Sequence, residues 1–112
     1  MRSPITTHIL DTSLGRPAAG VPVRLERLDT EWSVLAEAET DSDGRVTDLL
    51  RPDQLVAGTY RMFFDTDSYW ERRGEKGFYP FVEIVFSVDE VQEHYHVPLL
   101  LNPFGYSTYR GS

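Results

Sequence analysis

Three histidines are the residues of this sequence best suited to acid–base chemistry near neutral pH. His94 and His96 occupy alternate positions of an apolar run, and His8 lies in a second apolar run near the N-terminus. Alternation along a strand places His94 and His96 on one face and Tyr95 and Val97 on the other, which is the expected core face. Such histidines can act as general base and general acid. A solvated strand face without a chemical role is the alternative.

A metal site is a second interpretation of the same histidines. Two histidines at i and i+2 of a strand can chelate zinc, with His8 as a third ligand. The sequence contains no cysteine, and no carboxylate spacing singles out a fourth ligand. We therefore expect no metal and no other cofactor. The lack of cysteine also excludes disulfides and thiolate nucleophiles.

Arg45 directly follows the run Asp41-Ser42-Asp43-Gly44, which is typical of a turn. An arginine can hold a carboxylate or a developing oxyanion with two hydrogen bonds. A solvated strand end is the alternative and is the commoner fate of an arginine. The turn has a faint likeness to a calcium loop, but the rest of that pattern is missing.

The length and charge of the chain limit its function. Its 112 residues fit one domain, residues 1–112, and leave little chain to enclose a deep pocket, so a sizeable site is expected to need a second subunit. The formal net charge of −7 argues against nucleic-acid and anionic-membrane partners. Because the sequence has neither an apolar run near the roughly 20 residues of a membrane span nor an apolar leader, we expect a cytoplasmic protein.

Short apolar segments separated by prolines and glycines are typical of an all-β sandwich or barrel. The segments expected as strands are residues 5–10, 21–28, 32–40, 45–49, 60–65, 81–88, 94–102 and 104–110. A loop is expected over residues 15–20.

One short helix is expected within residues 65–76, with its N-cap at one of the residues 66–68. Ser68 and Glu71 fit a capping box, and Gly74 is expected to end the helix.

Both ends of the sequence resemble the transthyretin-like family. Its start is similar to that family's start over residues 5–18 (ITTHILDTSLGRPA). Its end resembles the family's enzymatic branch, the 5-hydroxyisourate hydrolases, over residues 94–101 (HYHVPLLL) and 103–112 (PFGYSTYRGS). Residues 43–46 (DGRV) and 78–86 (FYPFVEIVF) also match. The terminal Tyr-Arg-Gly-Ser is the most specific piece, because it separates the hydrolases from the hormone carriers.

The resemblance implies a transthyretin-like β-sandwich of two four-stranded sheets with one short helix. It implies a homotetramer, built as a dimer of dimers, with sites at the dimer–dimer interface. The implied activity is hydrolysis of 5-hydroxyisourate to 2-oxo-4-hydroxy-4-carboxy-5-ureidoimidazoline in urate degradation.

The resemblance places the family's catalytic positions on His8, Arg45, His96 and Ser112. His8 and His96 would position and deprotonate water, and one of them would return the proton to the leaving nitrogen; which histidine does which stays open. Arg45 would hold the electron-rich ring or stabilise the oxyanion. His94 is not carried over with equal weight.

The C-terminal motif adds substrate-binding positions at Tyr109, Arg110 and Gly111. Tyr109 and Ser112 would orient the substrate through their hydroxyls, and Ser112 would also supply the terminal carboxylate. Gly111, which has no Cβ, would let the backbone approach a ligand closely. A covalent intermediate on Ser112 is a less supported alternative, because no carboxylate–His–Ser order accompanies it.

Two other functions stay open. A transthyretin-type carrier of small molecules would use the same interface without catalysis, but two histidines and an arginine make that surface polar rather than apolar. A metal-binding β-sandwich is the other, and sensitivity to chelators would distinguish it.

Overall fold

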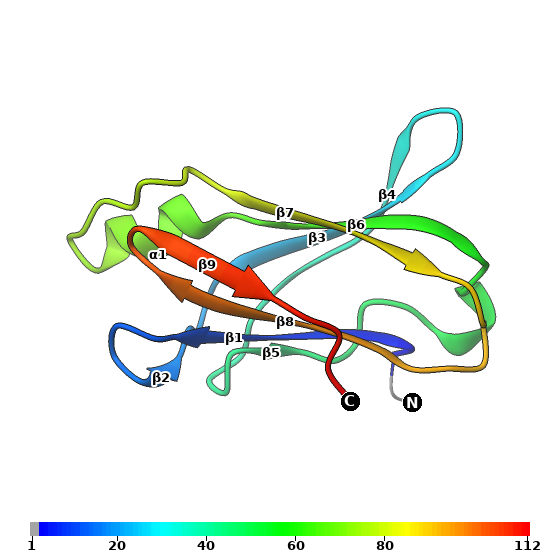
Figure 1. Ribbon diagram of the computed structural model, residues 1–112, viewed down its shortest axis with the longest axis horizontal. Coiled ribbons are helices and arrows are strands. Elements are labelled where there is room, and N and C mark those ends of the chain that lie inside the picture. The colour runs from blue at the N-terminus through cyan, green and yellow to red at the C-terminus, as the bar shows by residue number, and fades with distance from the viewer. Residues whose placement is uncertain (1–2) are drawn as a thin grey trace.

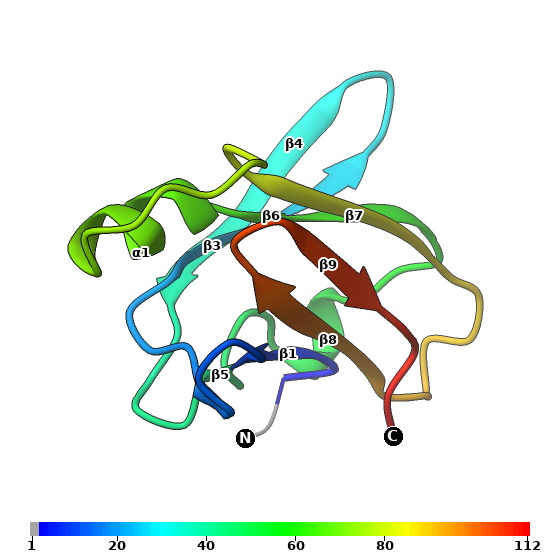
Figure 2. The ribbon, with the colours of Figure 1, turned by 60° about the vertical axis from the view of Figure 1, so that its left-hand side comes forward.

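The computed structural model describes residues 3–112 as two facing β-sheets with one short α-helix at one end (Figure 1, Figure 2). In chain order the elements are β1 (Ile5–Asp11), β2 (Arg16–Pro17), β3 (Pro22–Leu28), β4 (Trp32–Glu39), β5 (Arg45–Val46), the 3-10 turn η1 (Pro52–Gln54), β6 (Gly58–Phe64), α1 (Thr66–Arg72), β7 (Val82–Val88), β8 (Tyr95–Asn102) and β9 (Gly105–Thr108). The first sheet has the order β2-β1-β8-β9, with β5 also paired to β1, and the second has the order β4-β3-β6-β7. The predicted all-β sandwich is confirmed.

The first sheet carries the strands that bear the histidines. β1 runs parallel to β8, and β9 returns antiparallel to β8. β1 also pairs with β2 and β5, which have two residues each. Four strands were expected in this sheet, and β2 is the addition, formed within the expected loop over residues 15–20. Gly15 and Gly20, with φ of 68° and 74°, adopt the left-handed conformation on either side of β2 and so turn the chain back beside β1.

Two predicted strands are shorter than expected. The segment 45–49 is a strand only at Arg45–Val46, because the chain then bends so that Leu49 and Leu50 enter the core from a loop. The hydroxyl of Ser3 accepts a hydrogen bond from the Leu50 amide at 3.0 Å and fixes that loop. The segment 104–110 is a regular strand only at Gly105–Thr108.

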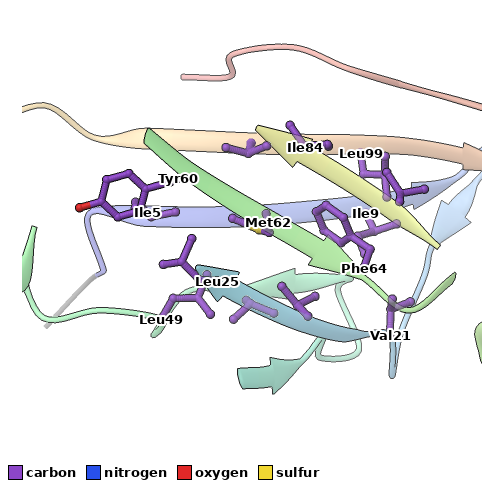
Figure 3. Close-up of a cluster of buried hydrophobic side chains, with 14 of the residues drawn as sticks. Ile5, Ile9, Val21, Leu25, Leu49, Tyr60, Met62, Phe64, Ile84 and Leu99 are labelled. Carbon is purple, nitrogen blue, oxygen red and sulfur yellow. The ribbon is translucent and has the colours of Figure 1, made fainter. Parts of the chain in front are cut away.

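The hydrophobic core lies between the two sheets (Figure 3). Alternation on β1 and β6 directs Ile5, Ile9, Met62 and Phe64 into it, each with 0% of its surface exposed. On β8 the predicted core face of Tyr95, Val97, Leu99 and Leu101 is confirmed, since all four are buried. The opposite face of β8 is thereby fixed as the outer face of the first sheet.

The N-cap of α1 lies one residue before the first of the expected caps. Asp65 is its N-cap and accepts a hydrogen bond from the Ser68 amide at 3.2 Å, so the expected capping box of Ser68 and Glu71 is wrong. The end of the helix is as predicted, because Gly74 has a φ of 69° and its amide donates to the Glu71 carbonyl. No helix among the described residues has the length and apolar character needed to cross a membrane.

A buried carboxylate joins this helical segment to β1. Asp11 has 0% of its surface exposed, forms an ion pair with Arg73, and accepts hydrogen bonds from Tyr69 and Ser13. Burial raises the pKa of Asp11, but the hydrogen bonds from Ser13 and Tyr69 and the charge of Arg73 outweigh it and leave that pKa below its usual value. Burial and the bond to Asp11 raise the pKa of Tyr69 to about 12.

Candidate active site

Three of the predicted site residues lie on one outer face of the first sheet. His8 of β1 is the register partner of Arg45 on β5 and of Pro98 on β8, and Thr6 is the partner of His96. Residues directly opposite each other in a sheet share a face. His8, Arg45 and His96 are therefore brought together, although they are far apart in the sequence.

His8 and His96 are diagonal neighbours across β1 and β8, two residues apart in register. Strand spacing and rise place such Cα atoms about 8 Å apart, with both side chains on the same face. The face therefore has two imidazoles and one guanidinium around a single small area.

The environment of His8 favours its neutral form. Partial burial and the adjacent positive charge of Arg45 lower its pKa below 6.5, against opposing effects of a hydrogen bond with the Asp43 backbone and the charges of Asp41 and Asp43. At neutral pH the imidazole of His8 is thus mostly uncharged and able to accept a proton.

A tight turn holds Arg45 beside His8. The Asp41 carboxylate accepts hydrogen bonds from the amides of Asp43 at 2.9 Å and Arg45 at 3.0 Å. Gly44 has a φ of 73°, and its carbonyl accepts from the Ile9 amide at 2.8 Å. A Cβ at Gly44 would lie 2.5 Å from the Ile9 carbonyl oxygen, so only glycine allows this approach. The expected turn is confirmed, and it presents Arg45 to the site.

His96 is held from both edges of its ring. Its Nδ1 lies 2.8 Å from the hydroxyl of Thr6. A Cβ on Gly111 would lie 2.6 Å from Cδ2, on the opposite edge, and 3.0 Å from Cγ of Pro98. His96 is only 8% exposed within one chain, although it lies on the outer face, because the C-terminal segment covers it. The glycine predicted to approach a ligand therefore packs closely against His96.

The C-terminal segment follows β8 beyond the end of β9 (Figure 1). Gly111 pairs with His96 in the register that pairs Thr108 with Leu99, and its amide donates to the His96 carbonyl at 2.9 Å. The ladder is interrupted opposite Pro98, which has no amide N–H to donate. The hydroxyl of Thr108 donates instead to the Pro98 carbonyl at 2.7 Å.

Arg110 fastens this segment to the start of β8. Its guanidinium donates to Glu93 at 2.8 Å and to the His94 carbonyl at 3.3 Å, and it lies over the Tyr95 ring at 4.5 Å. Tyr109 and Ser112 are exposed at the surface of the single chain.

A cavity of about 250 Å³ opens between β7, β8 and the C-terminal segment. Its lining includes His96, Tyr109 and Arg110 but neither His8 nor Arg45. One chain thus brings His8, Arg45 and His96 to one face, but its cavity includes only His96 of these three. Among residues 3–112, no three histidine, aspartate or glutamate side chains are grouped so that they could hold a metal ion.

The predictions from the sequence did not include Thr6, and they gave His94 less weight than His8 and His96. The structure places the Thr6 hydroxyl within 2.9 Å of the His94 ring as well as beside His96. The sequence did contain one indication of a role for Thr6. Thr6 lies two residues before His8 and hence on the same face of a strand. The parallel pairing with β8, which brings Thr6 to His96, had no signal in the sequence.

Comparison with known proteins shows which family the chain resembles in sequence and in fold. The model of the HIUase/Transthyretin family matches residues 5–111. 5-Hydroxyisourate hydrolase of Mus musculus is 50% identical over 113 residues, which cover 98% of this chain and 96% of the relative. 5-Hydroxyisourate hydrolase of Halalkalibacterium halodurans is 45% identical over 119 residues, with 100% of both chains covered.

Solved structures of both branches of the family superimpose on this chain. Klebsiella pneumoniae 5-hydroxyisourate hydrolase is 39% identical, with a TM-score of 0.86 over 96% of this chain and 97% of the other. Sea bream transthyretin in complex with thyroxine is 35% identical, with a TM-score of 0.93 over 97% and 95%. The backbone alone does not separate the branches, so residues at the site must do so. On sequence and structure together, the chain belongs to the HIUase/Transthyretin family.

Proposed function

We propose that this protein is a hydrolase that opens 5-hydroxyisourate to 2-oxo-4-hydroxy-4-carboxy-5-ureidoimidazoline in urate degradation. The observation that carries the proposal is the meeting of His8, Arg45 and His96 on one outer face of the first sheet. Relatives up to 50% identical over nearly the whole chain bear the name 5-hydroxyisourate hydrolase.

The polarity of this outer face favours a catalytic function over a role as a small-molecule carrier. A carrier of small aromatic molecules would gain most from bulky apolar side chains, which bury the ligand. Two imidazoles and a guanidinium instead provide proton transfer and oxyanion stabilisation. The terminal Tyr109-Arg110-Gly111-Ser112 supports the same choice, because the hydrolase branch has this motif.

The chemistry requires a water molecule to add to a ring carbonyl. His8 and His96 position this water and remove its proton, and one of them returns a proton to the ring nitrogen as the carbon–nitrogen bond breaks. Arg45 stabilises the negative charge that develops on the carbonyl oxygen. The neutral state of His8, which follows from its lowered pKa, fits a group that accepts a hydrogen bond or a proton.

The C-terminal residues complete the site in this proposal. Tyr109 and Ser112 reach the substrate through their hydroxyls, and Ser112 adds the terminal carboxylate. Arg110 and Gly111 hold that segment in place, since Arg110 bonds Glu93 and Gly111 packs on His96. Ser112 acts without forming a covalent intermediate, and no metal or cofactor takes part.

We further propose that the single domain assembles as a homotetramer, a dimer of dimers, with two copies closing each site. The cavity of one chain contains His96 in its lining but neither His8 nor Arg45, which supports a site completed by a second copy. Light scattering at micromolar concentration should give four times the chain mass. A monomeric mass with full activity would overturn the assembly but not the reaction.

The test of function is the decay of freshly made 5-hydroxyisourate, followed by absorbance with and without the protein. Because the compound also decays spontaneously, the expected result is acceleration in proportion to protein concentration. Chelation should leave that acceleration unchanged. Binding of the compound without acceleration would favour the carrier, and activity lost to a chelator and restored by zinc would favour a metal enzyme.

A further inference from the structure

The hydroxyl of Thr6 bridges two histidines beside the proposed site. Its Oγ1 lies 2.9 Å from Nε2 of His94 and 2.8 Å from Nδ1 of His96. Thr6 is 1% exposed, and the two rings are stacked with centroids 6.4 Å apart. A buried hydroxyl that contacts a ring nitrogen of each histidine links the hydrogen-bond roles of the two rings.

When the Thr6 hydroxyl donates its proton to one of the two rings, the bridge has two directions. A hydroxyl has one proton to donate, and a neutral imidazole has one N–H. In one arrangement Nδ1–H of His96 donates to Thr6, whose hydroxyl donates to Nε2 of His94. In the other arrangement Nε2–H of His94 donates to Thr6, whose hydroxyl donates to Nδ1 of His96. In the first arrangement Nε2 of His96 has a free lone pair that can accept a proton. In the second arrangement Nε2 of His96 carries a proton.

Only the first arrangement is compatible with a ring that gains and loses a proton during turnover. A His96 imidazolium carries a proton on Nδ1 and must donate it, so Thr6 must then act as the acceptor. In the first arrangement nothing has to move when Nε2 is protonated. In the second arrangement the Thr6 hydroxyl would have to turn its proton away from Nδ1 of His96 before it could accept a hydrogen bond there. A bridge that needs no reorganisation lowers the barrier.

We infer that Thr6, oriented by His94, holds His96 in its Nδ1–H tautomer and so makes His96 the base that removes the proton from water. The inference rests on the proposed function and assigns roles within it. Nε2 of His96 takes the proton as the water oxygen attacks the carbonyl, and gives that proton to the ring nitrogen as the carbon–nitrogen bond breaks. The proton count is balanced and His96 returns to its starting state. Thr6 and His94 are positioning residues, because they act through His96.

The experiment combines tautomer measurement with kinetics. Nitrogen-15 NMR of the histidine rings reads the tautomer of His96 in the free protein, and turnover of 5-hydroxyisourate gives kcat and KM. Three variants are compared: Thr6→Val, which removes the hydroxyl; Thr6→Ser, which keeps it; and Thr7→Val as the matched control. Thr7 is buried on the opposite face of β1, and its hydroxyl donates to the Val97 carbonyl at 2.6 Å, away from the histidines.

The expected result is an Nδ1–H tautomer of His96 in the wild type and in Thr6→Ser. In Thr6→Val this tautomer should be lost. The value of kcat should then fall roughly tenfold to a hundredfold with little change in KM, because a misoriented base loses part of the rate enhancement that a general base provides. Thr7→Val should keep kcat per folded molecule. If Thr6→Val does not fold, His94→Leu, which removes the acceptor of the Thr6 hydroxyl, should lower kcat in the same way.

An Nε2–H tautomer of His96 in the wild type, or an unchanged kcat in Thr6→Val, would overturn the inference. A wild-type protein that fails to accelerate the decay would overturn the proposed function instead, and the NMR result would still report on the bridge.

Discussion

The backbone of Gly111 lies against the Cδ2 edge of the His96 imidazole, while the hydroxyl of Thr6 meets the opposite edge at Nδ1. The ring is thereby clamped between the end of the chain and its first strand. Chain ends are usually mobile and tolerant of change. Here the end contributes to the position of a proposed catalytic side chain.

Gly111→Ala should damage catalysis more than folding. The new Cβ would lie 2.6 Å from His96, so either the ring or the C-terminal segment must move. We expect kcat to fall at least about tenfold, because a displaced base loses part of its catalytic effect. Gly105→Ala in β9 is the matched control, since its Cβ would meet only the Asn102 side chain at 3.8 Å. Equal kcat values for the two variants would show that the clamp is not needed.

Gly44→Ala should destabilise the protein and displace Arg45. Alanine would be strained at the backbone φ of 73°, and its Cβ would lie 2.5 Å from the carbonyl oxygen of Ile9. Gly15→Ala is the control, because Gly15 has a similar φ of 68° with nothing within 4 Å of its Cβ position. Urea unfolding should show a loss of about 1–2 kcal/mol for the control, from conformation alone, and a larger loss for Gly44→Ala. Equal losses would mean that the Ile9 contact adjusts without cost.

The pKa of His8 should respond to its charged neighbours in opposite directions. Arg45 lowers this pKa, so Arg45→Gln should raise it, whereas the Asp43 carboxylate raises it, so Asp43→Asn should lower it. Titration of the His8 ring protons by NMR measures both shifts. In the wild type, kcat/KM should fall as the pH drops through the His8 pKa, which lies below 6.5, because the neutral ring is the active form. Shifts of the same sign in both variants would refute this electrostatic account.

Arg73→Met should strongly destabilise the fold, because it leaves the Asp11 carboxylate buried without its charge partner. The expected loss in the free energy of unfolding is about 3–5 kcal/mol, measured by urea unfolding at neutral pH.

Because the pKa of Asp11 is lowered on folding, its ionised form stabilises the protein above pH 3.8, and this contribution is lost as the pH falls through the folded pKa. The stability difference between wild type and Asp11→Asn should therefore narrow at acidic pH. A constant difference from pH 7 to pH 2 would contradict the assignment.

The sequence allowed the outer face of β8 to be predicted because its alternation is regular. Tyr95 and Val97 are buried as expected, and His96 lies on the opposite face. Beyond the last predicted strand, Gly111 pairs with His96. The interruption between Thr108 and Gly111 was not foreseen, since it arises from the missing amide proton of Pro98 on the neighbouring strand.

What could not be predicted depends on contacts between distant segments. β1 and β8 are separated by most of the chain, and their parallel register alone brings Thr6 to His96 and His8 to Pro98. Local patterns carry no information on that register. The predicted N-cap of the helix lay too late in the sequence. Asp65 is the N-cap, but the sequence analysis had assigned Asp65 to the preceding strand, predicted over residues 60–65.

The central claim is that His8 and His96 carry out the hydrolysis of 5-hydroxyisourate. The most direct measurement is kcat on freshly made substrate for wild type, His8→Ala and His96→Ala at matched oligomeric state. We predict that each substitution lowers kcat by about 10²–10⁴, the range for loss of a general acid or base, while the fold is retained. Wild-type kcat in either variant would remove that histidine from the mechanism and contradict this account of the site.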